Sequence, residues 1–134
     1  MASRTLGVWI ACDPKKVYEL VSNLEHLPRW ATTFCRSIAR NGSEWVLQTP
    51  QGPMRMRIAL PNSWGVVDHY VIPSPGVEVY VPMRIVPHLG GSEVLFTLFR
   101  QPNMTDASYA EDARLVEQDL QSLKRLLEAG HPTR

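Results

Sequence analysis

The 134-residue chain has no apolar run long enough to cross a bilayer, which takes about 18 consecutive apolar residues. It also lacks an N-terminal signal core, so we expect a cytoplasmic protein without stable membrane insertion. Its 14 basic and 13 acidic residues nearly cancel, and no run of Lys or Arg stands out. Nucleic acids attract basic surfaces, so a nucleic-acid partner is disfavoured.

Metal-binding and nucleophile motifs are absent as well. The two cysteines, Cys12 and Cys35, have neither CxxC nor Cys/His ligand spacing, so we expect buried thiols and no metal site. There is no GxSxG, GxxxxGK[ST], GxGxxG or HExxH segment. Hydrolase, nucleotide-dependent and zinc-peptidase activities therefore have no motif support, and we expect no cofactor.

The clearest element that the sequence does contain is a long amphipathic helix over residues 108–129. Apolar residues recur along it at alternating spacings of four and three, namely Tyr109, Ala113, Val116, Leu120, Leu123 and Leu127. The candidates for its N-cap are Thr105, Asp106 and Ser108. Ser108 and Glu111 have the spacing of a capping box, and Gly130 is placed for a C-cap. Such a stripe must pack against another surface.

Upstream of this helix the chain begins with a strand and two short helices. Residues 5–11 alternate in polarity and predict a strand. Asp13 followed by Pro14 then marks the start of a short helix. Pro28 interrupts the next segment, which predicts a second, shorter helix over residues 24–31.

Six further strands are expected between these helices and the last one, over residues 34–40, 43–49, 54–60, 66–72, 77–86 and 93–100. Asn41-Gly42 predicts a hairpin in which Ile38 faces Trp45. Pro82 cannot donate a ladder hydrogen bond, so we expect a bulge or a broken bond there.

The alternation of apolar residues defines an inner face for this sheet. Met56 lies on it, and His69 joins it if the register sets Arg57 opposite Asp68. Two outer-face pairs are expected, Arg57 with Asp68 and Arg84 with Glu93. The fold class that follows is α+β, in which a curved antiparallel sheet of six to seven strands wraps around the C-terminal helix. Residues 1–134 are expected to form a single domain.

Several sequence runs resemble the START-like helix-grip superfamily, also called SRPBCC or the polyketide cyclase/dehydrase family. These runs are CDPKKVYELVSNLEHLPRW from Cys12, GVVDHYV from Gly65, VPMRIVP from Val81 and GSEVLFTLFRQPNMT from Gly91. The last two also resemble a small bacterial subgroup. The resemblance covers nearly the whole chain and implies an elongated cavity for an apolar or aromatic molecule between sheet and helix.

The residues expected to contact such a ligand are Trp30, Arg36, Met54, Met56, His69, Val79, Val81, Met83, Phe96, Tyr109 and Val116. Flexible thioethers suit a wall that adapts to a ligand, although methionines also fill irregular cores. His69 has two interpretations. It donates to a ligand carbonyl or acts as general acid or base, or it is a core histidine whose polar atoms bond to the backbone or to water.

Three other residues also have two interpretations each. Trp30 stacks on a ligand or fastens the short helices to the sheet. Arg36 binds a ligand carboxylate at the rim or extends along the sheet edge. The Tyr109 hydroxyl reaches the cavity, or its ring only packs.

Three functions are compatible with these features. The first is binding of a lipid-, quinone- or polyketide-like molecule. The second is a cyclase, dehydratase or isomerase activity without metal, in which His69 is the general acid or base and Arg36 or Tyr109 orients the substrate. The third is an interaction module that resembles the chaperone cochaperones of the superfamily. The sequence does not determine the oligomeric state.

Overall fold

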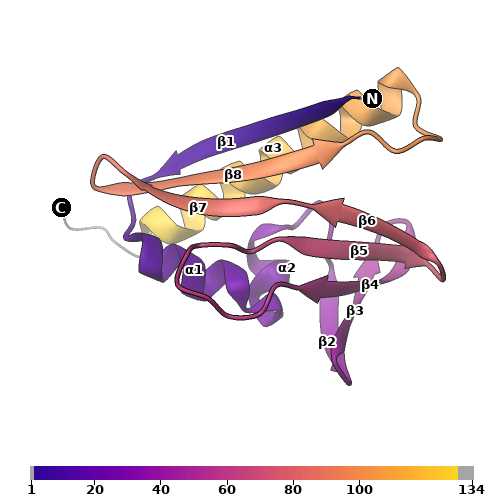
Figure 1. The fold of residues 1–134 in the computed structure, drawn as a ribbon, viewed down its shortest axis with the longest axis horizontal. Coiled ribbons are helices and arrows are strands. Elements are labelled where there is room, and N and C mark those ends of the chain that lie inside the picture. The colour runs from indigo at the N-terminus through magenta and orange to yellow at the C-terminus, as the bar shows by residue number, and fades with distance from the viewer. Residues whose placement is uncertain (1, 130–134) are drawn as a thin grey trace.

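The computed structural model describes residues 2–129, so the expected cap at Gly130 lies outside the described residues. The elements in chain order are β1 (Ser3–Ile10), α1 (Pro14–Ser22), the 3-10 helix η1 (Leu24–His26), α2 (Leu27–Trp30), β2 (Ser37–Asn41), β3 (Glu44–Thr49), β4 (Gly52–Ile58), β5 (His69–Ser74), β6 (Val77–Val81), β7 (Met83–His88), β8 (Gly91–Phe99) and α3 (Asp106–Ala129). The predicted α+β helix-grip class is confirmed: antiparallel strands pack against a long C-terminal helix (Figure 1).

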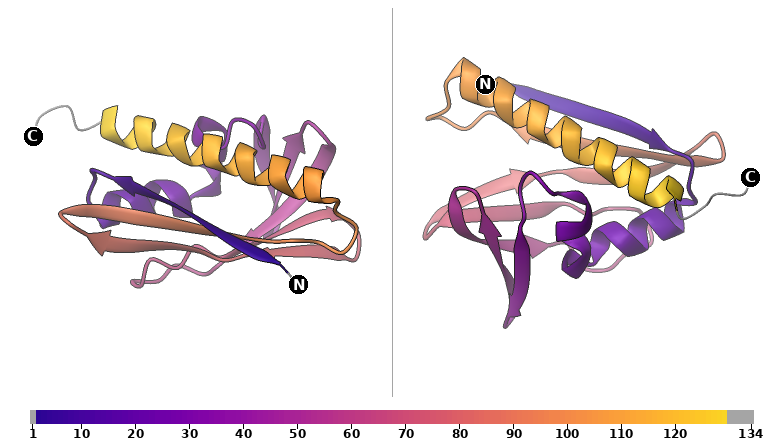
Figure 2. Two further views of the ribbon diagram at one scale, coloured as in Figure 1. Left: turned by 90° about the horizontal axis from the view of Figure 1, so that it is seen from above. Right: turned by 180° about the vertical axis from the view of Figure 1, so that it is seen from behind.

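The strands form two sheets instead of one continuous sheet. A three-stranded sheet has the order β1-β8-β7, and a five-stranded sheet has the order β2-β3-β4-β5-β6. α3 runs along the three-stranded sheet, as the two views of Figure 2 show, and it also contacts α2. The long helix and the inner face of the five-stranded sheet are therefore separate walls of one interior.

Pro82 lies at the point where the two sheets separate. The strand predicted over residues 77–86 stops at Val81 and resumes at Met83, where the chain passes from the five-stranded to the three-stranded sheet. The expected break in the ladder is confirmed. Proline has no amide hydrogen to donate, and its carbonyl instead accepts from the Thr97 amide at 2.9 Å.

The register between strands differs from the prediction by two residues at three places. Ile38 pairs with Leu47 and not Trp45. Similarly, the partner of Arg57 is Tyr70 and not Asp68, and the partner of Glu93 is Val86 and not Arg84. Both predicted outer-face ion pairs are therefore wrong. Side chains alternate with a period of two, so each residue nevertheless stays on its predicted face.

The first hairpin shows the physical reason for one of these shifts. The chain turns at Gly42 and Ser43, one residue later than predicted, and Asn41 stays in β2 opposite Glu44. Gly42 has φ +65°, in the left-handed region where glycine meets no steric penalty, whereas Asn41 does not. An Asn-Gly turn of the predicted type needs a positive φ at both residues.

The N-terminus of α3 is capped by Thr105, one of the predicted candidates. The Thr105 hydroxyl accepts from the Ser108 amide, and the Ser108 hydroxyl accepts from the Thr105 amide, both at 3.0 Å. This reciprocal pair is a capping box. The predicted box of Ser108 with Glu111 is wrong, because Glu111 forms an ion pair with Arg114 instead.

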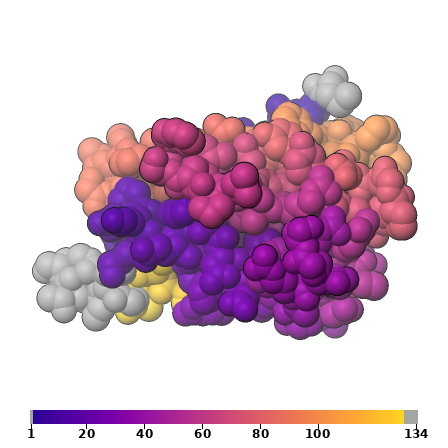
Figure 3. All heavy atoms as spheres, turned by 60° about the horizontal axis from the view of Figure 1, so that its bottom comes forward, coloured from indigo at the N-terminus to yellow at the C-terminus, as the bar shows by residue number. Residues whose placement is uncertain are grey.

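One end of the interior is tightly packed, and we call it the packed end. The residues that define it have no exposed surface: Ile10, Val17, Val94, Leu120 and Leu123. α1 and α2 close this end; Asp13 caps α1 by accepting from the Lys15 amide at 2.9 Å. In Figure 3, atoms of α1 lie at this end, those of the first strands of the five-stranded sheet lie at the other end, and the C-terminal part of α3 is visible only at the margin.

No helix within residues 2–129 has both the length and the apolar composition needed to cross a bilayer.

Candidate functional site

Cross-strand pairing gathers the candidate residues into two rows on the inner face of the five-stranded sheet. The first row, across β3 to β6, consists of Trp45, Met56, Val71 and Val79. The neighbouring row, across β4 to β6, consists of Ile58, His69 and Val81. His69 thus lies on an apolar wall, on the face that the alternation pattern predicted.

Away from the packed end, inner side chains keep part of their surface accessible. We call this region the accessible end, and its half-buried apolar residues are Leu6, Met54, Val71, Val79, Phe96, Leu98, Tyr109 and Val116. They come from both sheets and from α3. Met56, Val81 and Met83, by contrast, are at most 5% exposed and belong to the core. The expected ligand-contacting residues are therefore divided between a solid core and an accessible wall.

His69 lies where the two ends meet. The residue is 9% exposed, and the centroid of its ring is 6.0 Å from that of Phe96 in an edge-to-face arrangement. Its Nδ1 is 3.1 Å from the carbonyl oxygen of Val67. Desolvation lowers the pKa of His69 below its ordinary value and outweighs the opposing effects of the Val67 carbonyl and the Asp68 charge. The imidazole is therefore neutral at pH 7.

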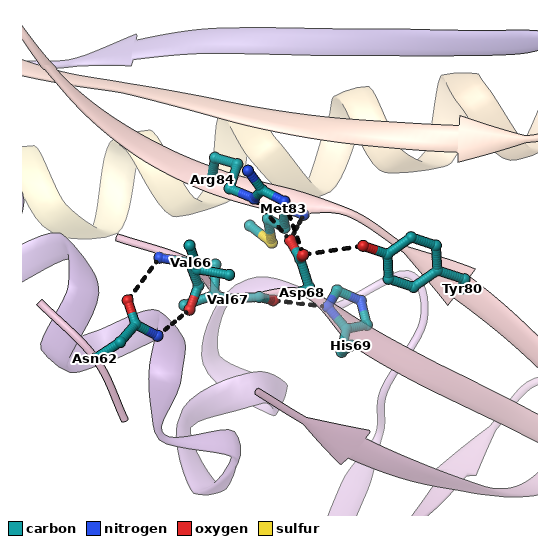
Figure 4. A network of polar contacts seen from close by, with 8 residues as sticks. All are labelled: Asn62, Val66, Val67, Asp68, His69, Tyr80, Met83 and Arg84. Carbon is teal, nitrogen blue, oxygen red and sulfur yellow. Dashed lines mark hydrogen bonds and ion pairs between the residues drawn. The ribbon is translucent and has the colours of Figure 1, made fainter. Parts of the chain in front are cut away.

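Asp68, next to His69, points to the opposite face and ties together the strands that meet at Pro82 (Figure 4). Its carboxylate accepts from the Met83 amide at 2.8 Å, the Tyr80 hydroxyl at 3.0 Å and the Arg84 guanidinium at 3.0 and 2.9 Å. Desolvation raises the pKa of Asp68, but these donors outweigh it and hold the pKa below its ordinary value. This carboxylate fixes the backbone from which His69 projects.

The loop before His69 is fixed by Asn62. Its side chain donates to the carbonyl of Val66 at 2.9 Å and accepts from the Val66 amide at 3.1 Å, as Figure 4 shows. The next contact is made by Gly65, which has φ +73° and lies so close to Ile85 that a Cβ atom would be 2.3 Å from the Ile85 carbonyl oxygen. A side chain has no room there and the positive φ disfavours one, so this close approach of the loop to β7 requires glycine.

The other polar candidates lie apart from His69. Trp30 is 4% exposed and belongs to the core cluster on α2. Arg36 is exposed just before β2. The Tyr109 hydroxyl donates to the Leu98 carbonyl at 2.8 Å, so its proton is already engaged. The structure therefore gathers apolar candidates around His69 but does not bring Arg36 to them.

Asp119 is a buried polar residue that the sequence analysis did not identify. It is 5% exposed on α3, and its carboxylate accepts from the Thr33 amide at 3.1 Å and the Thr33 hydroxyl at 2.8 Å. Desolvation raises the pKa of Asp119 and outweighs the two hydrogen bonds that lower it. Its spacing of three from Val116 and four from Leu123 places it on the buried stripe, which is the signal that could have found it.

Two hollows on the molecular surface lie apart from His69, although the smaller one includes Met54 of the accessible end. The smaller, about 140 Å³, is lined by Val46, Pro53, Met54, Arg55, Ile72, Pro73, Ser74 and Pro75. The larger, about 470 Å³, is lined by Asp13, Pro14, Pro87, His88, Leu89, Gly90 and Gly91. Neither includes His69, and the larger is an open surface depression at the β7–β8 turn.

Nucleophilic and metal chemistry have little support in the described part of the chain. Burial raises the pKa of the Cys35 thiol to about 11, which leaves almost no thiolate at neutral pH. No group of three or more His, Cys, Asp or Glu residues within positions 2–129 is arranged to hold a metal ion. The chemistry available at the inner wall is that of a neutral imidazole among apolar groups.

The fold and this wall define the class to which the structure belongs, the START-like helix-grip fold. No protein-family model matches the sequence, and no curated protein matches it significantly. Solved structures of similar fold include XoxI from Bacillus cereus (TM-score 0.77, 18% identity, covering 95% of this chain and 96% of that one). A START superfamily protein from Mycobacterium smegmatis gives a TM-score of 0.74 at 14% identity, covering 95% and 97%. DynU16, from the dynemicin biosynthetic locus, also gives 0.74 at 14% identity, and the match covers 96% of this chain but 48% of DynU16.

Proposed function

We propose that the chain binds a hydrophobic or aromatic small molecule of lipid-, quinone- or polyketide-like character between the five-stranded sheet and α3. The observation that carries this proposal is the set of half-buried apolar side chains from both sheets and α3, one of which, Phe96, lies against the ring of the neutral His69. Apolar walls with few polar groups are the usual lining of small-molecule sites. The START superfamily neighbour supports the same assignment.

A bulky substitution that fills the accessible end tests this proposal. Val79→Trp fills the space next to Val71 on the inner wall. The matched control is Val86→Trp, because Val86 is 41% exposed on the outer face of β7. Native mass spectrometry of the protein purified from its source should detect a bound small molecule, and a lipid and aromatic library should contain compounds that raise its melting temperature. Val79→Trp should abolish both effects, and Val86→Trp should retain them. Equal binding by the two variants would place the ligand elsewhere, and no binding by the wild type would remove the proposal.

A second candidate function, a cyclase- or dehydratase-like activity, is favoured by one observation at the same wall. A neutral imidazole in which only Nδ1 is hydrogen-bonded is suited to take a proton on Nε2 from a bound substrate. His69→Ala separates the two functions: it should abolish turnover of a polyketide-like ketone if His69 is the base, while binding is retained. Absence of turnover in the wild type leaves binding alone.

A further inference from the structure

The hydrogen bond of His69 determines which of its ring nitrogens carries the proton. A backbone carbonyl oxygen can only accept a hydrogen bond, so the 3.1 Å contact between Nδ1 and the Val67 oxygen places the proton on Nδ1. Desolvation disfavours a second proton and outweighs the Val67 carbonyl and the Asp68 charge, which favour it. The adjacent carboxylate, Asp68, is turned to the other face and already accepts from Met83, Tyr80 and Arg84. The ring is therefore the neutral Nδ1–H tautomer, and Nε2 has a lone pair.

That lone pair has no partner among the described residues, and Nε2 is not fully buried. Nε2 makes no hydrogen bond to any residue in positions 2–129. Over the same residues, no fully buried side-chain nitrogen or oxygen lacks a partner, so Nε2 keeps some accessible area although His69 is only 9% exposed. Its surroundings are apolar, because the cross-strand partners of His69 are Ile58 and Val81 and its ring contacts Phe96. An acceptor with accessible surface in an apolar wall has unused hydrogen-bonding capacity for a guest.

We infer that the proposed ligand site selects apolar molecules that carry a hydroxyl group, such as a phenol, an enol or a sterol-like alcohol, and that the hydroxyl donates to Nε2 of His69. This inference rests on the proposed function. It assigns His69 the role of acceptor, in place of the donor to a carbonyl that the sequence suggested. A carbonyl or ether oxygen would face the lone pair without a proton between them, and a carboxylate would add an unpaired charge in an apolar site.

A matched series of probes tests the selectivity. The probes 2-naphthol, 2-methoxynaphthalene and 2-naphthaldehyde share one ring system, but only the first has a hydroxyl proton. We expect 2-naphthol to bind the wild type about three- to tenfold more tightly than the other two, the range expected for one neutral hydrogen bond. His69→Phe keeps a ring and removes the acceptor, so it should bring the three affinities together. His69→Gln, which retains an acceptor oxygen, should keep part of the preference.

The possible outcomes separate this inference from the function on which it rests. Probes that bind equally, or a preference for the ether or aldehyde, would overturn the inference alone, provided that Val79→Trp still blocks binding. Failure of all three probes to bind the wild type would overturn the proposed function and the inference together. A direct measurement does not depend on binding or on any variant: nitrogen-15 NMR of the wild type should show a protonated Nδ1 and an unprotonated Nε2. A proton on Nε2 would overturn the inference.

Discussion

The two ends of the interior are built from the same apolar residue types, yet they differ in packing. At the packed end, side chains from β1, α1, β8 and α3 have no accessible surface. At the accessible end, the three-stranded sheet and α3 contribute again, now together with the five-stranded sheet, and present half-buried residues. The short helices account for this difference, because α1 and α2 cover only the first region. Residue type alone therefore does not distinguish the core from the accessible wall in this fold; coverage by α1 and α2 does.

The largest difference between the two ends should be in stability. Leu120→Ala removes a fully buried side chain from the packed end and should lower the free energy of unfolding by about 2–5 kcal/mol. Leu98→Ala makes the same change in a half-buried residue of the accessible end, where a loss of roughly 1 kcal/mol is expected. Urea unfolding measures both. Equal losses would mean that the accessible end is as well packed as the other.

The junction between the ends should be the next most sensitive region. Asp68→Ala removes the acceptor of Met83, Tyr80 and Arg84 at the Pro82 break and should cost about 1.5–3 kcal/mol. Glu78→Ala, a control on the outer face, breaks an exposed pair with Arg57 and should cost much less. Urea unfolding at pH 7 compares the two variants. A loss no larger than that of the control would show that the sheets are held together without Asp68.

The sequence predicted on which face of the sheet each side chain lies, but it did not predict the register between neighbouring strands. Met56 and His69 were assigned to the inner face because alternation has a period of two, and the observed register errors were also of two residues. The register itself depends on turn geometry, such as the glycine conformation at Gly42, which composition does not report.

Two other features could not be predicted from the sequence, for a different reason. These are the covering of the packed end by α1 and α2 and the hydrogen bonds between residues far apart in the chain. Asp119 bonds to Thr33, which is 86 residues away. Likewise, Pro82 predicted a broken ladder but not a passage between two sheets. Such contacts depend on how distant segments meet, which local periodicity does not encode.

His69 should give the accessible end a pH dependence. Its pKa is lowered in the folded state, so the unfolded state binds more protons as the pH falls below about 6.5. The wild type should therefore lose stability from neutral toward acidic pH, and His69→Phe should lose less over the same range. Thermal unfolding between pH 7 and pH 5 measures this difference. Parallel curves for the two proteins would show that the imidazole is hydrated in the folded state.

Asp119 should give the opposite and smaller trend on α3. Its pKa is raised in the folded state, so the folded state holds a proton above the unfolded pKa of about 3.9 and loses that advantage as the pH rises through its own pKa. Asp119→Asn keeps one acceptor for Thr33 and does not titrate. Its stability relative to the wild type should rise from pH 3 to pH 7. A constant difference across this range would contradict the raised pKa.

The position of Trp45 has a practical consequence for observing the interior. Its half-buried indole lies in the row that contains Met56, Val71 and Val79. Indole emission moves to shorter wavelength as water leaves its surroundings. A small molecule that binds beside this row would therefore shift the emission of Trp45, and no added dye would be needed to detect it. A variant that keeps Trp45 as its only tryptophan would therefore report occupancy of the wall through its own fluorescence.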